Sequence, residues 1–315
     1  MEKRKLGNSG ISIAPLMFGG NVFGWTADEA MSFKLLDAFV GAGFDAIDTA
    51  DVYSKWVPGH KGGESETILG KWLKARGGRD KLIIATKVGM EMPGIGQGLR
   101  KDYILARVED SLKRLQTDYV DLYQSHTDDQ SAPLDETLGA YQKLIDQGKV
   151  RAIGASNYEA PRLAQALKAS AAARLPRYET LQPLYNLSDR EGFEKELQPL
   201  CVKENVGVIP YYALAAGFLT GKYRSEADFG KSPRGARMKA YLNDRGRRIL
   251  KALDDVAVGL KAKPGQVALA WLMTRPAITA PIASATSMAQ MEELIGAVRL
   301  KLGPDALKAL DAASA

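Results

Sequence analysis

The sequence FDAIDTADVY, residues 44–53, begins as a buried strand and ends in polar side chains. Its first half is apolar, and Asp48 and Tyr53 then follow five residues apart where the strand leaves into a loop. Two later apolar stretches end in a similar way, because LIIATK ends at Lys87 and YVDLYQSH ends at His126. Polar residues at the carboxyl ends of buried parallel strands are the usual position of chemistry in a (β/α) barrel. These strands are therefore predicted to bring the four side chains to one end of one sheet.

Apolar strand-like segments alternate with helical patterns along the whole chain. Strands separated by helices pair in parallel with right-handed crossovers, and eight such units predict an α/β fold, a (β/α)8 TIM barrel, over residues 1–315 as one domain. The alternative fold is an open doubly wound sheet, but the GxGxxG motif expected after the first strand of such a fold is absent. The predicted strands are 14–20, 44–48, 82–87, 119–126, 150–156, 180–185, 206–212 and 279–284.

Two segments fall outside the repeating pattern. Residues 3–13 carry the turn signal Asn-Ser-Gly between short alternating stretches, which predicts an N-terminal β-hairpin. Residues 213–244 have no clear periodicity and predict a long loop after strand seven, and a connection of that length is usually functional. After the second strand, we expect Ser65 to cap a helix.

The composition is that of an ordinary globular protein, with 45% hydrophobic and 25% charged residues among 315. No apolar run is long enough to cross a membrane, and the first residues lack the apolar core of a signal peptide. The single cysteine, Cys201, excludes an internal disulfide and favours a cytoplasmic location. The net charge is +6, but no dense run of lysine and arginine with interleaved aromatics is present. The nearest segment, 231–248, indicates a solvated surface or a phosphate-bearing small ligand and not a nucleic acid.

The four polar residues at the strand ends suit hydride transfer to a carbonyl group. Such a reaction needs an acid to protonate the carbonyl oxygen, and Tyr53 is predicted to be the proton donor. An ammonium at Lys87, held by Asp48, is expected to lower the phenol's pKa by stabilising the phenolate. A hydrogen bond from His126 would polarise and orient the carbonyl.

Each of these residues alone also has an ordinary structural explanation, as a cap, a packed ring or a solvated charge. Their joint occurrence at successive strand ends favours the catalytic interpretation. Metal-dependent hydrolysis would need several histidine or carboxylate ligands, and the chain has only His60 and His126 as histidines, so no metal site is predicted.

The motifs resemble those of the aldo-keto reductase superfamily, whose catalytic tetrad is matched by DTADVYS, IATK and YQSH. The resemblance extends over nearly the whole chain, through SETILGKWL, GKVRAIGASN, LQPLYN, VIPYYALAAGFLTGKY and PIASATSMAQMEEL. It implies a nicotinamide dinucleotide bound without a Rossmann fold, with NADPH preferred and NADH less expected. The residues implied to hold that cofactor are Ser156, Asn157, Gln182, Tyr211, Leu214, Gly217, Lys222, Arg234, Ser284, Thr286, Gln290 and Glu293.

The chain departs from the family pattern at several positions. Ser54 follows the tetrad tyrosine where glycine is common, and Tyr212 and Ala213 replace a frequent Ser-Pro. No basic residue lies between Pro281 and Glu293, although recognition of a 2′-phosphate would prefer one. The expectation of NADPH therefore depends on the family more than on residues of this chain.

The substrate pocket is expected in the loops above the tetrad, with Phe23, Trp25, Trp56 and Asp128 as its candidate residues. The resemblance implies reduction of an aldehyde or ketone, such as a sugar or an aryl carbonyl, to an alcohol. Two alternatives stay open: an alcohol or sugar dehydrogenase working oxidatively, and a cofactor-binding partner protein like the potassium channel β subunits of the same superfamily. A monomer or a small homo-oligomer is expected.

Overall fold

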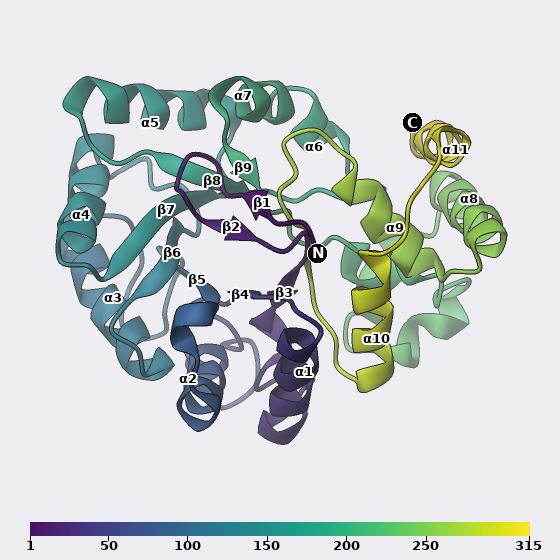
Figure 1. Cartoon of the computed structure of the whole chain (residues 1–315), viewed down its shortest axis with the longest axis horizontal. Helices are drawn as coiled ribbons and strands as arrows, with labels where there is room; N and C mark the ends of the chain where they lie inside the picture. Colours follow the sequence, from purple (N-terminus) through teal and green to yellow (C-terminus); the bar gives the residue numbers. More distant parts are fainter.

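Eight strands form the central sheet of the structure, a computed structural model that describes all residues, Met1–Ala315. Their order is β10-β3-β4-β5-β6-β7-β8-β9, and every neighbouring pair is parallel. The two ends of this order meet, because Val208 bridges Ile278 and the Ile282 amide donates to the Pro210 carbonyl at 2.9 Å. The sheet therefore closes, which confirms the predicted (β/α)8 barrel (Figure 1). The strands are β3 (Met17–Gly19), β4 (Ala46–Asp48), β5 (Ile83–Val88), β6 (Val120–Ser125), β7 (Val150–Ser156), β8 (Tyr178–Gln182), β9 (Gly207–Val208) and β10 (Ile282–Ala283).

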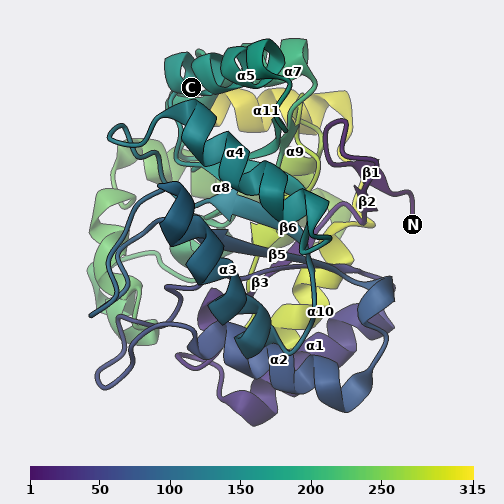
Figure 2. The ribbon, with the colours of Figure 1, turned by 90° about the vertical axis from the view of Figure 1, so that its left-hand side faces the viewer.

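The predicted N-terminal hairpin is present, as β1 (Arg4–Lys5) paired antiparallel with β2 (Ser12–Ile13). Its apolar side chains Leu6, Ile11 and Ile13 are buried against small and branched residues from the barrel strands, such as Ala46 and Ala85. The hairpin thus closes one end of the barrel. Figure 2 shows it at the right, with the green segment between β9 and α8 at the left, so the long loop lies toward the other end.

Helices surround the sheet and bury the larger apolar core against its outer face. Figure 2 shows α1 and α2 below the strands and α5 and α7 above them. Cys201 lies in α7 and is fully buried. None of the helices combines the length and the apolar character that crossing a membrane requires. The helices are α1 (Glu29–Gly41), α2 (Glu64–Arg76), α3 (Lys101–Leu115), α4 (Leu134–Asp146), α5 (Ala160–Ala173), α6 (Glu191–Glu194), α7 (Leu197–Glu204), α8 (Asp244–Leu260), α9 (Pro264–Met273), α10 (Met288–Ala297) and α11 (Pro304–Ser314).

The expected cap at Ser65 is wrong, because α2 begins at Glu64 and its N-cap is Gly63 in a left-handed conformation. The Ser65 hydroxyl is buried and donates to the Gly20 carbonyl at 2.8 Å, with the Thr49 hydroxyl 2.7 Å away. The serine therefore ties α2 to the carboxyl ends of β3 and β4 instead of capping the helix.

The long segment after β9 is folded into short 3-10 turns, η3 (Ala215–Thr220), η4 (Glu226–Lys231) and η5 (Gly235–Ala240). Tyr212, Ala215 and Ala216 have positive φ angles of 54°, 47° and 55° there. Left-handed backbone is costly for residues with a Cβ, and clustered examples are typical of functional loops. The two remaining short turns are η1 (Gly20–Val22) and η2 (Arg79–Lys81).

Candidate active site

The tetrad residues meet at the end of the barrel away from the hairpin. Asp48 ends β4, Lys87 lies in β5, and His126 directly follows β6. The Lys87 ammonium donates to Asp48 Oδ2 at 2.6 Å, to the Tyr53 hydroxyl at 2.8 Å and to the Thr49 carbonyl at 2.9 Å. The parallel register brings Lys87 and Asp48 to the same end of adjacent strands, which is why one ammonium reaches all three acceptors.

The Lys87–Asp48 ion pair is almost completely buried, with side-chain exposures of 0% and 1%. Buried charges are costly unless they are paired and hydrogen-bonded, and the Asp48 carboxylate meets this need on both oxygens. Its Oδ2 also accepts from Tyr53 at 3.1 Å, and its Oδ1 accepts from Gln182 Nε2 at 2.9 Å. This network holds the tyrosine hydroxyl in one place.

The expected lowering of the Tyr53 pKa is wrong for this structure. Burial first, and then the Asp48 carboxylate that accepts the tyrosine's hydrogen bond, raise the pKa of Tyr53 well above its ordinary value. Tyr53 is therefore protonated at neutral pH, the state that a proton donor needs. The Lys87 ammonium still donates to the phenol oxygen, so it stabilises the negative charge left after proton transfer.

His126 faces Tyr53 across the site, with ring centroids 6.0 Å apart and planes at 72°. Burial, and then the charge of Lys87, hold the pKa of His126 well below its ordinary value, so the imidazole is neutral at neutral pH. A neutral imidazole keeps one N–H for donation. The residue's backbone is fixed by Asn157, whose side-chain amide donates to the His126 carbonyl at 2.9 Å.

A cavity of about 1010 Å³ opens over the tetrad. Asp48, Tyr53 and His126 line it, while Lys87 lies beneath them. All twelve residues that the family resemblance implied for the cofactor line this cavity. Polar side chains from three strand ends form the wall next to the tetrad, where Tyr211 donates to Asn157 Oδ1 at 2.9 Å and Ser156 donates to the Gln182 carbonyl at 2.8 Å.

The middle of the cavity is cationic. Lys222 and Arg234 line it, and neither has an acidic partner within 4 Å; the Arg234 guanidinium lies over the Trp25 ring at 5.0 Å. Lys231 also lines it, but Asp228 neutralises that lysine at 2.7 Å. Two cations without a counter-charge at one cavity wall suit an anionic ligand.

The candidate substrate residues are placed differently from one another. Trp56 lines the cavity and is 45% exposed. Trp25 lies outside the cavity lining and packs edge-on against Trp56, with the two ring centroids 5.5 Å apart. Phe23 is fully buried against Phe18, outside the cavity lining.

Asp128 likewise lies outside the lining, because it forms an ion pair with Arg162 at 2.9 Å. The sequence could not predict this ion pair, because Asp128 and Arg162 lie on separate segments that only the fold brings together. It removes Asp128 from contact with a ligand in this cavity.

Several residues that sequence reasoning did not single out complete the lining. Asn21 and Met90 follow strand ends, a position that could have identified them. Lys263 and Gln266 come from the start of α9, and no motif marked them. They enter the site because the barrel brings the beginning of α9 beside α10.

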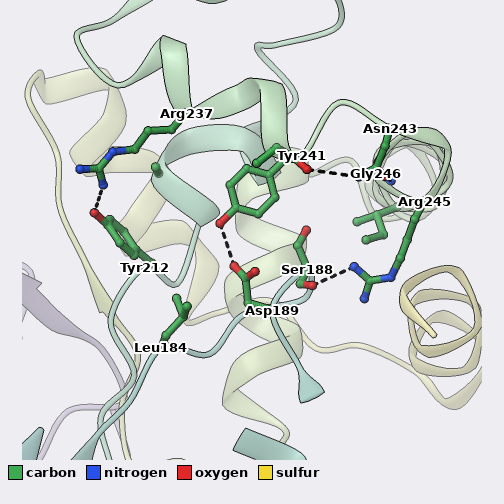
Figure 3. Close-up of a pocket in the computed structure, with 12 residues that line it drawn as sticks. Leu184, Ser188, Asp189, Tyr212, Arg237, Tyr241, Asn243, Arg245 and Gly246 are labelled. Atoms are coloured by element: carbon green, nitrogen blue, oxygen red, sulfur yellow. Dashed lines mark hydrogen bonds between the residues drawn. The ribbon is translucent and has the colours of Figure 1, made fainter. Parts of the chain in front are cut away.

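A second cavity of about 340 Å³ adjoins the first and shares Tyr212 and Ala216 with it. Figure 3 shows its polar wall, in which Arg237 donates to the Tyr212 hydroxyl and Tyr241 donates to Asp189 Oδ2 at 2.8 Å. Tyr212, one of the departures from the family pattern, therefore stands between the two cavities.

The closed barrel, the buried tetrad and the cationic cavity together define an oxidoreductase of one family. The aldo/keto reductase family model matches residues 15–315, and the chain belongs to the aldo/keto reductase family. Similar proteins cover nearly its full length. It is 35% identical to the uncharacterized oxidoreductase YrpG of Bacillus subtilis, over 99% of this chain and 95% of the relative.

Two further relatives have more specific names. The chain is 30% identical to an aryl-alcohol dehydrogenase (NADP(+)) of Phanerodontia chrysosporium, over 96% of this chain and 83% of the relative. It is 31% identical to a probable voltage-gated potassium channel subunit beta of Arabidopsis thaliana, over 95% of this chain and 91% of the relative. The relatives of this chain therefore differ in their named roles, and the role of this chain depends on the residues of its own site.

Proposed function

We propose that this protein is an NADPH-dependent reductase that converts an aldehyde or ketone to an alcohol, with Tyr53 as the proton donor. The observation that carries the proposal is the single buried ammonium of Lys87, bonded to both Asp48 and the Tyr53 hydroxyl at the deep end of a cationic cavity. This arrangement keeps a proton on the phenol and stabilises the oxygen after the proton has left.

The donor set of the cavity fits a nicotinamide dinucleotide. Tyr211 offers an aromatic face and the amides of Asn157 and Gln182 suit a carboxamide, while Lys222 and Arg234 suit a pyrophosphate. The wall for adenosine consists of Ser284, Thr286, Gln290 and Glu293. When bound, the reduced nicotinamide supplies the hydride.

The side chains of the tetrad handle the substrate oxygen and its proton. The neutral His126 donates a hydrogen bond that orients and polarises the carbonyl. Tyr53 gives its proton to the oxygen as negative charge develops there, and Lys87 holds the resulting phenolate through the 2.8 Å hydrogen bond. Asp48 keeps the ammonium charged and in position.

Aryl carbonyl compounds are the substrate class that the pocket supports best. Trp56 lines the cavity beside Tyr53, whose ring lies 6.2 Å from that of Trp56, and Trp25 packs against Trp56 outside the lining. An aromatic side chain in a cavity wall suits a planar ligand. The aryl-alcohol dehydrogenase relative supports the same class, and the same groups would act in reverse for alcohol oxidation.

The test is a fluorescence titration of the protein with NADPH, followed by a panel of aryl and aliphatic aldehydes, ketones and sugars. Tyr53→Phe should leave the Kd for NADPH unchanged and lower kcat for carbonyl reduction by about a hundredfold or more. Tyr103→Phe removes a hydroxyl bonded to the Gly96 carbonyl and is the matched control. Turnover by Tyr53→Phe close to that of Tyr103→Phe would exclude Tyr53 as the donor, and no binding of either nicotinamide nucleotide would overturn the proposal.

The cellular setting belongs to this proposal as well. Burial raises the pKa of the only thiol, Cys201, to about 12, and a chain with no disulfide suits the reducing cytoplasm. A monomer or small homo-oligomer stays a prediction, which sedimentation would test.

A further inference from the structure

The far end of the cavity receives a cation from an unexpected element. The segment from Ile282 to Glu292 contains no lysine or arginine, yet the cavity wall there includes Lys263, the N-cap residue of α9. The Lys263 ammonium lies 3.5 Å from Glu293 Oε1, and both side chains are well exposed, at 66% and 38%. An exposed positive charge therefore lies beside the residues proposed for adenosine.

The backbone of Lys263 is held in place by contacts to α10. Its amide donates to Gln266 Oε1 at 3.0 Å, and Gln266 Nε2 donates to the Glu293 carbonyl at 3.1 Å. A Cβ on Gly296 would lie 2.3 Å from Gln266 Nε2, so the two helices approach closely at this point. The position of the lysine relative to Glu293 is thus fixed by packing, while its ammonium is free to change partner.

Other groups at this end also favour an anion. Gln290 Oε1 accepts from the Thr286 amide at 2.9 Å and from its hydroxyl at 3.1 Å, which leaves the Nε2 donor of Gln290 without a protein acceptor. Both α9 and α10, each of ten residues, begin here, and helix N-termini favour negative charge.

We propose that Lys263 binds the 2′-phosphate of the dinucleotide's adenosine ribose and makes this chain select NADPH over NADH. An exposed ion pair contributes little, so the ammonium can leave Glu293 cheaply for a phosphate that forms stronger charge-assisted bonds. Glu293 has the opposite preference, because an unpaired carboxylate repels a phosphate and accepts from a ribose hydroxyl. This inference rests on the proposed function, since it assumes that a nicotinamide dinucleotide occupies the cavity.

The experiment measures Kd by calorimetry for NADPH, NADH, adenosine 2′,5′-bisphosphate and adenosine 5′-diphosphate. Lys263→Ala should weaken the two ligands that carry a 2′-phosphate by about tenfold and leave the other two unchanged. Lys263→Arg should retain the preference. Adding Glu293→Gln to Lys263→Ala should restore part of the affinity for NADPH, because the repelling carboxylate is gone.

Lys251→Ala is the matched control, since it removes another exposed lysine that pairs with a carboxylate, Asp255, at 2.6 Å. An unchanged ratio of NADPH to NADH affinity in Lys263→Ala would overturn the inference and leave the proposed function standing. Equal losses for all four ligands would overturn it too, because they would mean a general charge effect. Failure of the unmodified protein to bind either dinucleotide would remove the proposed function instead.

Discussion

At the scale of single residues, Asp51 is the carboxyl group that the site leaves without a partner. It lies two residues before Tyr53 and is 1% exposed, and neither of its side-chain oxygens has a hydrogen bond. Burial, and then the nearby charge of Glu66, raise the pKa of Asp51 to about 8, against an opposing effect of Arg114. The folded protein therefore keeps this carboxyl protonated near neutral pH.

This shift predicts a pH dependence of stability. Between the ordinary pKa of 3.8 and the folded value of about 8, the native state holds a proton that the unfolded state has lost. The free energy of unfolding contributed by Asp51 should therefore fall as pH rises through that interval. Asp51→Asn should flatten this fall in denaturant titrations across the interval, whereas Asp80→Asn, which removes an exposed carboxylate, should keep it. An identical slope in both variants would contradict the assignment.

At the scale of elements, helix α2 depends on a glycine where it meets the end of α3. A Cβ at Gly70 would lie 2.1 Å from the Arg114 carbonyl oxygen, so the helices would have to separate. Gly70→Ala should lower the free energy of unfolding by about 1–3 kcal/mol, the usual cost of overpacking. Gly139→Ala in α4 meets no atom within 4 Å and should raise that free energy by about 0.5–1 kcal/mol through helix propensity. Equal effects in the two variants, measured by denaturation, would mean that the contact is not tight.

The elements also show how far the sequence could be interpreted. Periodicity predicted all eight strands and the hairpin, because burial on both faces leaves continuous apolar runs. It did not predict the role of Ser65, since a serine before a helix can either cap it or bond elsewhere. The tetrad could be named from local motifs at strand ends, whereas Lys263 could not, because its place in the cavity depends on how α9 packs on α10.

At the scale of the whole molecule, the closed sheet couples the two ends of the chain. Strand β3 pairs with β10, and residues 208–210 bond to residues 277–282, so neither half has a complete sheet alone. We propose that residues 1–315 unfold as one domain. In Trp271→Phe the remaining tryptophans, Trp25, Trp56 and Trp72, all lie near the N-terminus. Their fluorescence transition should coincide with that of far-ultraviolet circular dichroism, and a second, later dichroism transition would contradict the proposal.

The three hydrogen bonds of the Lys87 ammonium have a consequence for chemical self-protection. An amine attacks an aldehyde through a free lone pair, whereas the fully buried Lys87 ammonium directs its protons to Asp48, Thr49 and Tyr53. The only thiol, Cys201, is equally withdrawn from electrophiles by its burial in α7. The central lysine and the one cysteine of this aldo/keto reductase family protein are thus both shielded from covalent adducts.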